Sequence, residues 1–338
     1  MVIARLSTRN PAPDNDELLA SLVPPPQFAR VSFDSYLADP ARPSQGAARA
    51  ALEAFAAERG AGAGNAGRRW LRRRAAPPEA RPGVYLDGGF GVGKTHLLAA
   101  LWHAHRGPKS FGTFVEYTNL IGVLGFANAV TAFSDRALVC IDEFELDDPG
   151  DTVLMSTFLS QLVDRGVRLA ATSNTLPDRL GEGRFAADDF LREIQGLAAH
   201  FDVLRIDGED YRHRGEVARA EVFDREDLVD LVGTTPDSTL DDFTDLLAHL
   251  RTVHPSKYGA LVSDLSLVGL QDVVRLRDQA DALRFVVFVD RLYDRQVAVA
   301  GSGHSLTDIF APEMLAGGYR KKYYRCLSRL GALAVRPT

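Results

Sequence analysis

The sequence of 338 residues contains only two cysteines, Cys140 and Cys326, far apart in the chain. Such sparse cysteines argue against the disulfide framework of a small secreted protein. The first residues, MVIARLSTRNPAPDNDELL, have no apolar core of signal-peptide length, and the acidic Asp14, Asp16 and Glu17 argue against a transit peptide. We therefore expect a protein of the reducing cytoplasm.

The sequence also lacks any apolar run near the roughly 20 residues that a membrane helix needs, so we expect no transmembrane segment. Positive charge is not in excess either, because 39 lysines and arginines stand against 45 aspartates and glutamates. The net charge of -6 does not match nucleic acid, and it favours a protein or small-molecule partner. The eight histidines show no metal-ligand spacing, and the chain contains no N-K-x-D stretch, the pattern specific for guanine.

The length of the chain exceeds the size at which one hydrophobic core stops growing, so a large domain and a smaller one are expected. Composition divides the chain into four segments. These are an extended, proline-rich lead-in over residues 1–30, a helical and linker segment over 31–82, a larger core over 83–208 and a smaller C-terminal domain over 209–338.

A basic cluster stands out in the second segment. The stretch SQGAARAALEAFAAERG predicts a helix from Ser44 to Gly60, and a glycine-alanine linker then leads into GRRWLRRR. The cluster consists of Arg68, Arg69, Arg72, Arg73 and Arg74 around Trp70 and Leu71. It is either a solvated helix face or a site for an anionic partner.

From Gly83 onward, short apolar runs alternate with longer amphipathic ones, which is typical of a parallel sheet covered by helices. The predicted strands are residues 84–86, 113–117, 137–141, 167–172 and 203–206. The predicted helices are residues 94–105, 151–164 and 188–201, with a further helix over 118–133 that glycines interrupt. The sequence therefore predicts an α/β core with a parallel sheet flanked by helices.

The C-terminal segment predicts a smaller, mixed α/β domain. A helix is expected from Ser238 or Thr239 to about Leu250, and a strand, a helix and a strand are expected at SLVGL, residues 281–292 and VAVAG. The last helix carries three leucines spaced three residues apart: Leu327, Leu330 and Leu333. This stripe favours core packing over a nucleic-acid platform, although basic and aromatic residues accompany it.

The stretch LDGGFGVGKTHLL contains the pattern G-x-x-x-x-G-K-[ST], and it follows a predicted strand and opens a predicted helix. Glycines let the backbone curl so that successive N–H groups point at phosphates, and the helix N-terminus favours negative charge. Lys94 would reach the β- and γ-phosphates, and the Thr95 hydroxyl would ligate Mg²⁺. The predicted nucleotide-binding residues are Gly88, Gly89, Phe90, Gly91, Val92, Gly93, Lys94, Thr95 and His96.

Hydrolysis needs further groups, and the stretch ALVCIDEF supplies two carboxylates at the end of a predicted buried strand. Asp142 would hold Mg²⁺ through a water molecule, and Glu143 would polarise the attacking water. The next strand ends in Asn174, a candidate for orienting that water and sensing the γ-phosphate. Asn174 could also be a turn residue before Pro177.

Phosphoryl transfer develops charge that an arginine can neutralise from within the chain or from a neighbouring subunit. Arg184, in the glycine-flanked loop GEGRF, is the candidate arginine finger, and Arg192 on the following helix is the alternative. Arg325 or Arg329 could reach the nucleotide from the C-terminal domain. Each of these four arginines could instead be an ordinary helix-surface or solvated residue.

Taken together, several motifs resemble the ZapE family of AAA+-related P-loop ATPases, whose mitochondrial relatives act in protein quality control. They are GGFGVGKTHLL, LVCIDEFELDD, AATSN with LPDRL, FDVLRIDGEDYR, and RFVVFVDRLYDRQVAV followed by YRCLSRL. The order and spacing match over roughly residues 30–335. The first motif is shared with helicase loaders, whereas DEF, DYR and LYD are more particular.

The resemblance implies a nucleotide-dependent homo-oligomer, often a ring, that associates with the bacterial division machinery and its tubulin-like polymer. Carried over by motif, Lys94 and Thr95 match Walker A residues, Asp142 and Glu143 match Walker B residues, and Asn174 matches the first sensor. One departure concerns the family's arginine before FL, because this chain reads AADDFL at that place. Arg184 is therefore the substitute candidate for the arginine that acts in trans.

These observations predict an enzyme: a Mg²⁺-dependent ATPase that couples hydrolysis to remodelling or positioning a protein partner, with a link to cell division. An ATP-regulated nucleic-acid binding module of the helicase-loader type is the alternative, and GRRWLRRR and the basic C-terminal helix are its main support. A scaffold that binds ATP with negligible hydrolysis is a third reading, against which the two carboxylates argue.

Overall fold

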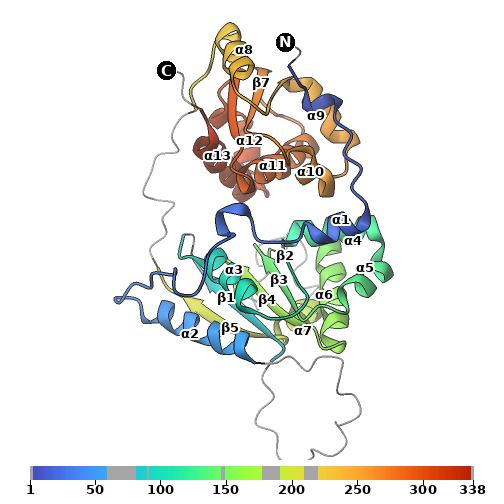
Figure 1. The fold of residues 1–338 in the computed structure, drawn as a ribbon, viewed down its shortest axis with the longest axis vertical. Helices are drawn as coiled ribbons and strands as arrows, with labels where there is room; N and C mark the ends of the chain where they lie inside the picture. Colours follow the sequence, from blue (N-terminus) through green and yellow to red (C-terminus); the bar gives the residue numbers. More distant parts are fainter. Residues whose placement is uncertain are drawn as a thin grey trace, which may run out of the picture. The chain divides into compact units, whose positions relative to one another are not determined.

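The computed structural model describes residues 3–58, 81–89, 91–145, 149–176, 191–208 and 220–335 (Figure 1). The chain divides into two compact units. The P-loop unit comprises residues 19–24 and 28–212, and the C-terminal unit comprises residues 1–18, 25–27 and 213–338. None of the described helices combines the length and the apolar character needed to cross a bilayer.

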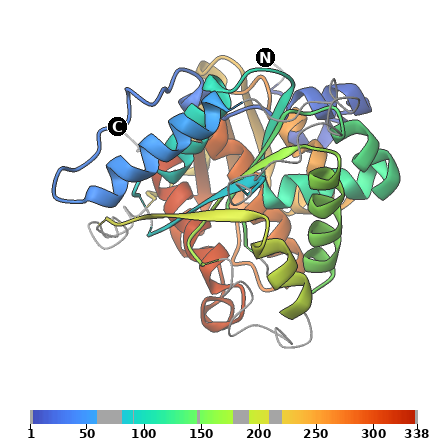
Figure 2. The same cartoon turned by 90° about the horizontal axis from the view of Figure 1, so that it is seen from below.

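The P-loop unit is built on a five-stranded sheet in the order β2-β3-β4-β1-β5, with every neighbouring pair parallel. Helices α2 and α3 pack together on one face, and α4 to α7 pack in succession on the other (Figure 2). This confirms the predicted parallel sheet flanked by helices. In chain order the elements are α2 (Pro43–Ala57), β1 (Gly83–Gly88), α3 (Lys94–Ala104), β2 (Lys109–Thr113), α4 (Phe114–Leu124), α5 (Phe126–Phe133), β3 (Leu138–Asp142), α6 (Pro149–Asp164), β4 (Arg168–Ser173), α7 (Leu191–Ala198) and β5 (Phe201–Ile206).

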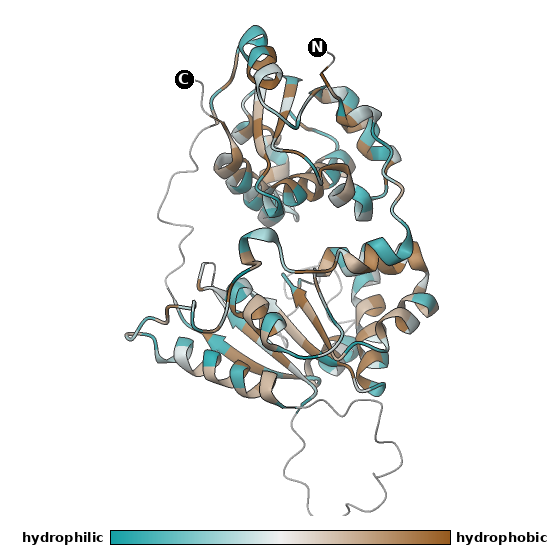
Figure 3. Cartoon of the chain, in the orientation of Figure 1, coloured by the Kyte–Doolittle hydropathy of each residue, from teal (hydrophilic) through white to brown (hydrophobic). Residues whose placement is uncertain are grey.

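The central strands of this sheet are buried because helices cover both of its faces. Every residue of β3 and β4 is buried, so neither strand shows the alternation of a half-exposed strand. Helix α2 instead buries one stripe, which contains Ala48, Leu52 and Phe55. Figure 3 shows the corresponding alternation of polar and apolar residues along α2.

The prediction of a strand over residues 113–117 is wrong, because β2 ends at Thr113 and α4 begins at Phe114. The Thr113 hydroxyl accepts a hydrogen bond from the Glu116 N–H at 3.3 Å, and the Glu116 carboxylate accepts one from the Thr113 N–H at 2.7 Å. The sequence T-F-V-E is therefore a capping box, whose local signal the apolar run around it obscured. The interruption predicted within residues 118–133 is confirmed at Gly125, which has φ 78°.

The end of the helix predicted over residues 188–201 is also wrong. Helix α7 ends at Ala198, and Phe201 is the first residue of β5. The Phe201 ring is fully buried and lies edge-on to Tyr85, with 5.6 Å between the ring centres. Burial against β1 therefore places Phe201 in the sheet.

The C-terminal unit contains a three-stranded parallel sheet in the order β6-β7-β8, which confirms the smaller α/β domain (Figure 1). Its largest core cluster includes Leu327, Leu330 and Leu333, so the predicted stripe is core packing. The helices and strands after the P-loop unit are α8 (Arg225–Thr234), β6 (Ser238–Asp242), α9 (Phe243–Thr252), α10 (Tyr258–Leu261), β7 (Leu267–Val273), α11 (Gln279–Asp294), β8 (Ala298–Gly303), α12 (Pro312–Ala316) and α13 (Arg320–Leu333), with 3-10 turns at Pro255–Lys257 and Leu306–Asp308.

The helix predicted to start at Ser238 or Thr239 begins later, because those two residues belong to β6. Thr239 and Asp241 point into the unit and are fully buried, as the alternation of a strand requires. Asp242 is the true cap of α9, since its carboxylate accepts hydrogen bonds from the N–H groups of Thr244 and Asp245 at 2.8 and 3.2 Å.

The N-terminal residues contribute to the packing of the C-terminal unit. The short elements before α2 are a 3-10 turn at Leu6–Thr8, α1 (Asn15–Ala20) and a 3-10 turn at Pro26–Phe28. The backbone N–H groups of Leu6 and Ser7 each donate a hydrogen bond of 2.8 Å to the buried Asp241 carboxylate. Leu6 itself is fully buried in the core cluster of this unit.

Candidate functional site

The candidate site lies at the carboxyl ends of β1, β3 and β4, which are neighbours in the P-loop unit in the order β3-β4-β1. After β1 the chain runs to β2 at one edge of the sheet, and after β4 it runs to β5 at the other. Ligands of open parallel sheets bind where the connections diverge in this way. The fold therefore brings together the ends of three strands that lie far apart in sequence.

The glycine-rich loop joins β1 to α3 and needs glycine at particular positions. Gly91 and Gly93 have φ values of 79° and 86°, in the left-handed region that side chains disfavour. A Cβ at Gly88 would lie 2.4 Å from the Ile206 carbonyl oxygen, so β5 excludes a larger residue there. Of the predicted loop residues, Phe90 lies outside the described part of the chain.

Lys94, the first residue of α3, lies across the loop. Its ammonium donates hydrogen bonds to the carbonyl oxygens of Gly88 and Gly89 at 2.7 and 2.5 Å, and to the Asn174 side-chain oxygen at 2.8 Å. Asn174 follows β4 directly. The lysine and the predicted sensor asparagine are therefore in contact, although 80 residues separate them.

Thr95 and Asp142 form the second contact of the site. The Thr95 hydroxyl lies 3.2 and 3.0 Å from the two carboxylate oxygens of Asp142. The Thr172 hydroxyl on β4 donates a hydrogen bond to the same carboxylate. Thr172 was missed in the sequence, although it stands in AATSN two places before Asn174.

Glu143 follows Asp142 in a left-handed backbone conformation with φ 53°. Such a conformation costs a residue with a side chain about 1–3 kcal/mol, and it occurs preferentially at functional sites. The Glu143 N–H donates a hydrogen bond of 3.1 Å to the Thr172 hydroxyl, and the next residue, Phe144, donates its N–H to the Thr172 carbonyl at 2.7 Å. Thr172 thus fixes both the carboxylate of Asp142 and the backbone turn that presents Glu143.

The electrostatics of Asp142 suit a cation site. Burial, together with the neighbouring charge of Glu143, raises the pKa of its carboxyl to about 6, and hydrogen bonds from Thr172 and Thr95 oppose the shift. The partners described for Asp142 are hydroxyl and backbone groups, none of which carries positive charge. A divalent cation would supply that charge.

The residues present fit Mg²⁺ in particular. Mg²⁺ prefers hard oxygen ligands and takes several of its ligands from water and substrate phosphates, and here a hydroxyl and a carboxylate lie side by side. Within the described ranges there is no group of three or more His, Cys, Asp or Glu side chains able to hold a metal ion. An ion held by Thr95 and Asp142 would take its remaining ligands from water and substrate phosphates.

Three of the four arginine candidates, Arg192, Arg325 and Arg329, lie in the described part of the chain. Arg192 lies on α7 with an exposed side chain. Arg325 and Arg329 lie on α13 in the C-terminal unit, where both bind the buried carboxylate of Asp290. Arg184 and the basic cluster at residues 68–74 lie outside the described residues.

Comparisons with known proteins identify the family of the chain. The profile of the AFG1-like ATPase family matches residues 14–227 and 218–336. The cell division protein ZapE of Escherichia coli K12 is 28% identical over 310 residues, which cover 78% of this chain and 81% of that protein.

Among solved structures, the AMPPCP-bound DnaA of Aquifex aeolicus is similar with 11% identity and a TM-score of 0.39, covering 90% of this chain and 91% of that one. The DnaC helicase loader has 19% identity and a TM-score of 0.36, covering 54% of this chain and 99% of that one. The family match extends over both units of the chain, and it agrees with the resemblance to ZapE found in the sequence. The chain therefore belongs to the AFG1-like ATPase family and is an ATP hydrolase of the P-loop class.

Proposed function

We propose that this chain is a Mg²⁺-dependent ATPase that uses hydrolysis to remodel or position a protein partner, in a process linked to cell division. The observation that carries the proposal is the pair of contacts at one edge of the sheet, Lys94 with Asn174 and Thr95 with Asp142. These four groups match the needs of phosphoryl transfer, which are positioning and electrostatic stabilisation. The name of the Escherichia coli relative supports the link to division.

In this proposal each side chain has a separate role. The Lys94 ammonium leaves its three oxygen partners and binds the β- and γ-phosphates, and the loop N–H groups from Gly88 to His96 hold the remaining phosphate oxygens. Thr95 and, through water, Asp142 hold Mg²⁺, which neutralises charge between the phosphates when bound. Asn174 orients the attacking water, and Glu143 accepts its proton.

Substitution of Glu143 tests hydrolysis separately from binding. Glu143→Gln keeps the shape of the side chain and removes its basicity, so we expect ATP binding near the wild-type level and turnover reduced at least about 100-fold. Lys94→Ala should lose both binding and turnover. The exposed Glu226→Gln on α8 is a matched control. Wild-type turnover in Glu143→Gln would show that the base is elsewhere.

We also propose that the chain acts as a nucleotide-dependent homo-oligomer in the cytoplasm. The arginine in trans would be Arg184 or Arg192. Specific activity should then rise with protein concentration and fall in the variant that lacks the correct arginine. A flat concentration profile from a monomer would exclude an arginine in trans. The two cysteines are buried and unpaired, which is consistent with a reducing compartment.

The proposed partner belongs to the division machinery, with its tubulin-like polymer as the first candidate. The Glu143→Gln variant held with ATP should sediment with that polymer, and the Lys94→Ala variant should not. Absence of ATP-dependent sedimentation would remove the polymer as the direct partner and leave other division proteins to be tested in the same way.

The alternative is an ATP-regulated nucleic-acid binding module of the helicase-loader type. Its main sequence support, the arginines of residues 68–74, lies outside the described residues, and Arg325 and Arg329 of the basic helix are bound to Asp290. ATP-dependent binding to single-stranded DNA that weakens with salt and with charge reversal at Arg72–Arg74 would favour this function over the first.

A further inference from the structure

A short segment before α2, residues 32–36, packs against the glycine-rich loop. Its residues belong to none of the motifs described so far. Tyr36 is 7% exposed, and its hydroxyl donates a hydrogen bond of 2.9 Å to the Val92 carbonyl oxygen. Its ring lies beside Gly93, where an added Cβ would come within 2.6 Å of the ring atom Cε2. One side chain therefore contacts two consecutive residues of the loop.

The bond to Val92 sets the direction of a loop N–H group. The C=O and the following N–H of a trans peptide point in opposite directions. When the Val92 carbonyl points at Tyr36, the Gly93 N–H points away from it. Gly93 has φ 86° and lies at the N-cap of α3 without a side-chain cap, so its own conformation has little local restraint.

A second link joins the same segment to α3. The His96 Nε2 atom lies 2.9 Å from the Ser35 hydroxyl and 3.3 Å from the Ser32 carbonyl oxygen. The Tyr36 and His96 rings are 5.7 Å apart between their centres. The segment thus holds the loop immediately before Lys94 and the helix immediately after Thr95.

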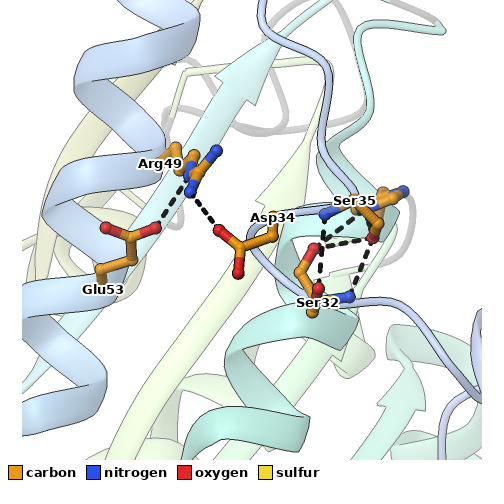
Figure 4. A network of polar contacts seen from close by, with 6 residues as sticks. Ser32, Asp34, Ser35, Arg49 and Glu53 are labelled. Carbon is orange, nitrogen blue, oxygen red and sulfur yellow. Dashed lines mark hydrogen bonds and ion pairs between the residues drawn. The ribbon is translucent and has the colours of Figure 1, made fainter.

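The segment is itself held in place (Figure 4). Ser32 and Ser35 form a closed turn, in which the Ser35 hydroxyl donates to the Ser32 carbonyl at 2.8 Å and accepts from the Ser32 N–H at 2.9 Å. Arg49 of α2 binds Asp34 at 2.7 Å and Glu53 at 2.8 Å, which ties the turn to α2. The turn at Ser32–Ser35 and the Arg49–Asp34 ion pair therefore restrain the backbone that carries Tyr36.

We propose that Tyr36 is a positioning residue for the phosphate cradle, which keeps the Gly93 N–H directed at bound phosphates. The proposal rests on the proposed ATPase function, and it adds a residue outside the P-loop on which phosphate affinity depends. Because the same N–H contacts the phosphates before and during hydrolysis, losing its orientation weakens binding more than turnover. The KM for ATP therefore rises while kcat changes little.

The test compares Tyr36→Phe, which keeps the ring, and Tyr36→Leu, which loses it, with Tyr258→Phe as matched control. Tyr258 is also buried and donates its hydroxyl to a backbone carbonyl, that of Leu250 at 2.6 Å, but it belongs to the C-terminal unit. The probes are a fluorescent ATP analogue and inorganic tripolyphosphate as a competitor that has no base or ribose. Melting temperatures verify that each variant is folded.

We expect Tyr36→Phe to weaken both ATP and tripolyphosphate by the same factor of about three to ten, which is the value of one hydrogen bond. Tyr36→Leu should weaken both further, and Tyr258→Phe should weaken neither. Unchanged tripolyphosphate affinity in Tyr36→Phe would overturn the proposal, since any loss for ATP would then arise at the base or ribose. Failure of the wild-type protein to bind ATP would instead overturn the proposed function itself.

Discussion

The Lys94 ammonium lies 2.8 Å from the Asn174 side-chain oxygen, which joins the start of α3 to the end of β4. The same ammonium is bound by the carbonyl oxygens of Gly88 and Gly89. Phosphate binding must replace these three oxygen partners. The asparagine is thereby coupled to the lysine as well as to the water that it is proposed to orient.

Substitutions at Asn174 should separate these two effects. Asn174→Asp places a carboxylate beside Lys94, which forms an ion pair that competes with the γ-phosphate, so ATP affinity should fall about tenfold or more. Asn174→Ala should leave affinity within a few-fold and reduce kcat about 100-fold, because a positioned polar group is lost. Titration with a fluorescent ATP analogue measures the affinity, and steady-state hydrolysis measures kcat. The control is Asn128→Asp, because Asn128 is an exposed asparagine on α5. If Asn174→Asp bound ATP with wild-type affinity, the coupling between Asn174 and Lys94 would be contradicted.

Asp142 should make the nucleotide-free protein less stable at neutral pH. Burial raises the pKa of its carboxyl from 3.8 to about 6, so the folded state holds the proton more tightly than the unfolded state. Relative to a side chain that does not ionise, Asp142 therefore leaves the free energy of unfolding unchanged well below the unfolded-state pKa, lowers it progressively as the pH rises to about 6, and keeps it lowered above that. Asp142→Asn should be more stable than the wild type at pH 7.5, by at most about 3 kcal/mol, and the gain should vanish at about pH 3.

Denaturant unfolding without nucleotide or Mg²⁺ measures this pH dependence, and the exposed Asp135→Asn is the control. Asp142→Asn should lose hydrolysis despite its greater stability. A wild-type protein that is the more stable one at pH 7.5 would mean that the contacts of Asp142 with Thr95 and Thr172 outweigh its burial.

Glu143 should carry a conformational cost that glycine relieves. Its φ of 53° disfavours a side chain, so Glu143→Gly should raise the free energy of unfolding by up to about 1 kcal/mol, after the greater chain entropy of glycine is subtracted. Glu143→Gln keeps the strain and should stay within about 0.5 kcal/mol of the wild type. Both should lose turnover. Equal stability of the Gly and Gln variants would show that the turn is not strained.

The ion pairs of Asp290 should stabilise the C-terminal unit. Burial opposes ionisation of this carboxyl, but the charges of Arg329, Arg325 and Arg291 outweigh it and lower its pKa. The stabilisation is therefore present above the unfolded-state pKa and is lost as the pH falls through the lower folded-state value. Arg329→Met should cost about 1–3 kcal/mol at pH 7, and adding Asp290→Asn should recover part of that loss.

A double-mutant cycle in denaturant gives the coupling between Arg329 and Asp290. The KM for ATP of Arg329→Met then decides the role of this arginine in the nucleotide site. An unchanged KM would assign Arg329 to the packing of its own unit alone. A raised KM would support its predicted role at the nucleotide.

Prediction from the sequence succeeded where local patterns sufficed. The glycines and Lys94 of the P-loop follow a motif whose spacing reflects a short-range geometry, and the buried strand β3 follows from the apolar run before Asp142. It was wrong where two local signals competed. The apolar Phe114, Val115 and Tyr117 outweighed the capping box of Thr113 and Glu116. The cap of α9, which is Asp242, was assigned three or four residues too early.

The sequence by itself determined the class of the protein: an α/β ATPase core with a phosphate-binding loop and two carboxylates after a buried strand. Only the tertiary structure decided which groups meet. The contacts of Thr172 with Asp142, Lys94 with Asn174 and Tyr36 with Val92 join residues 30, 80 and 56 positions apart. No local periodicity encodes such distances, because strand order and the packing of the segment before α2 arise from burial of the whole sheet.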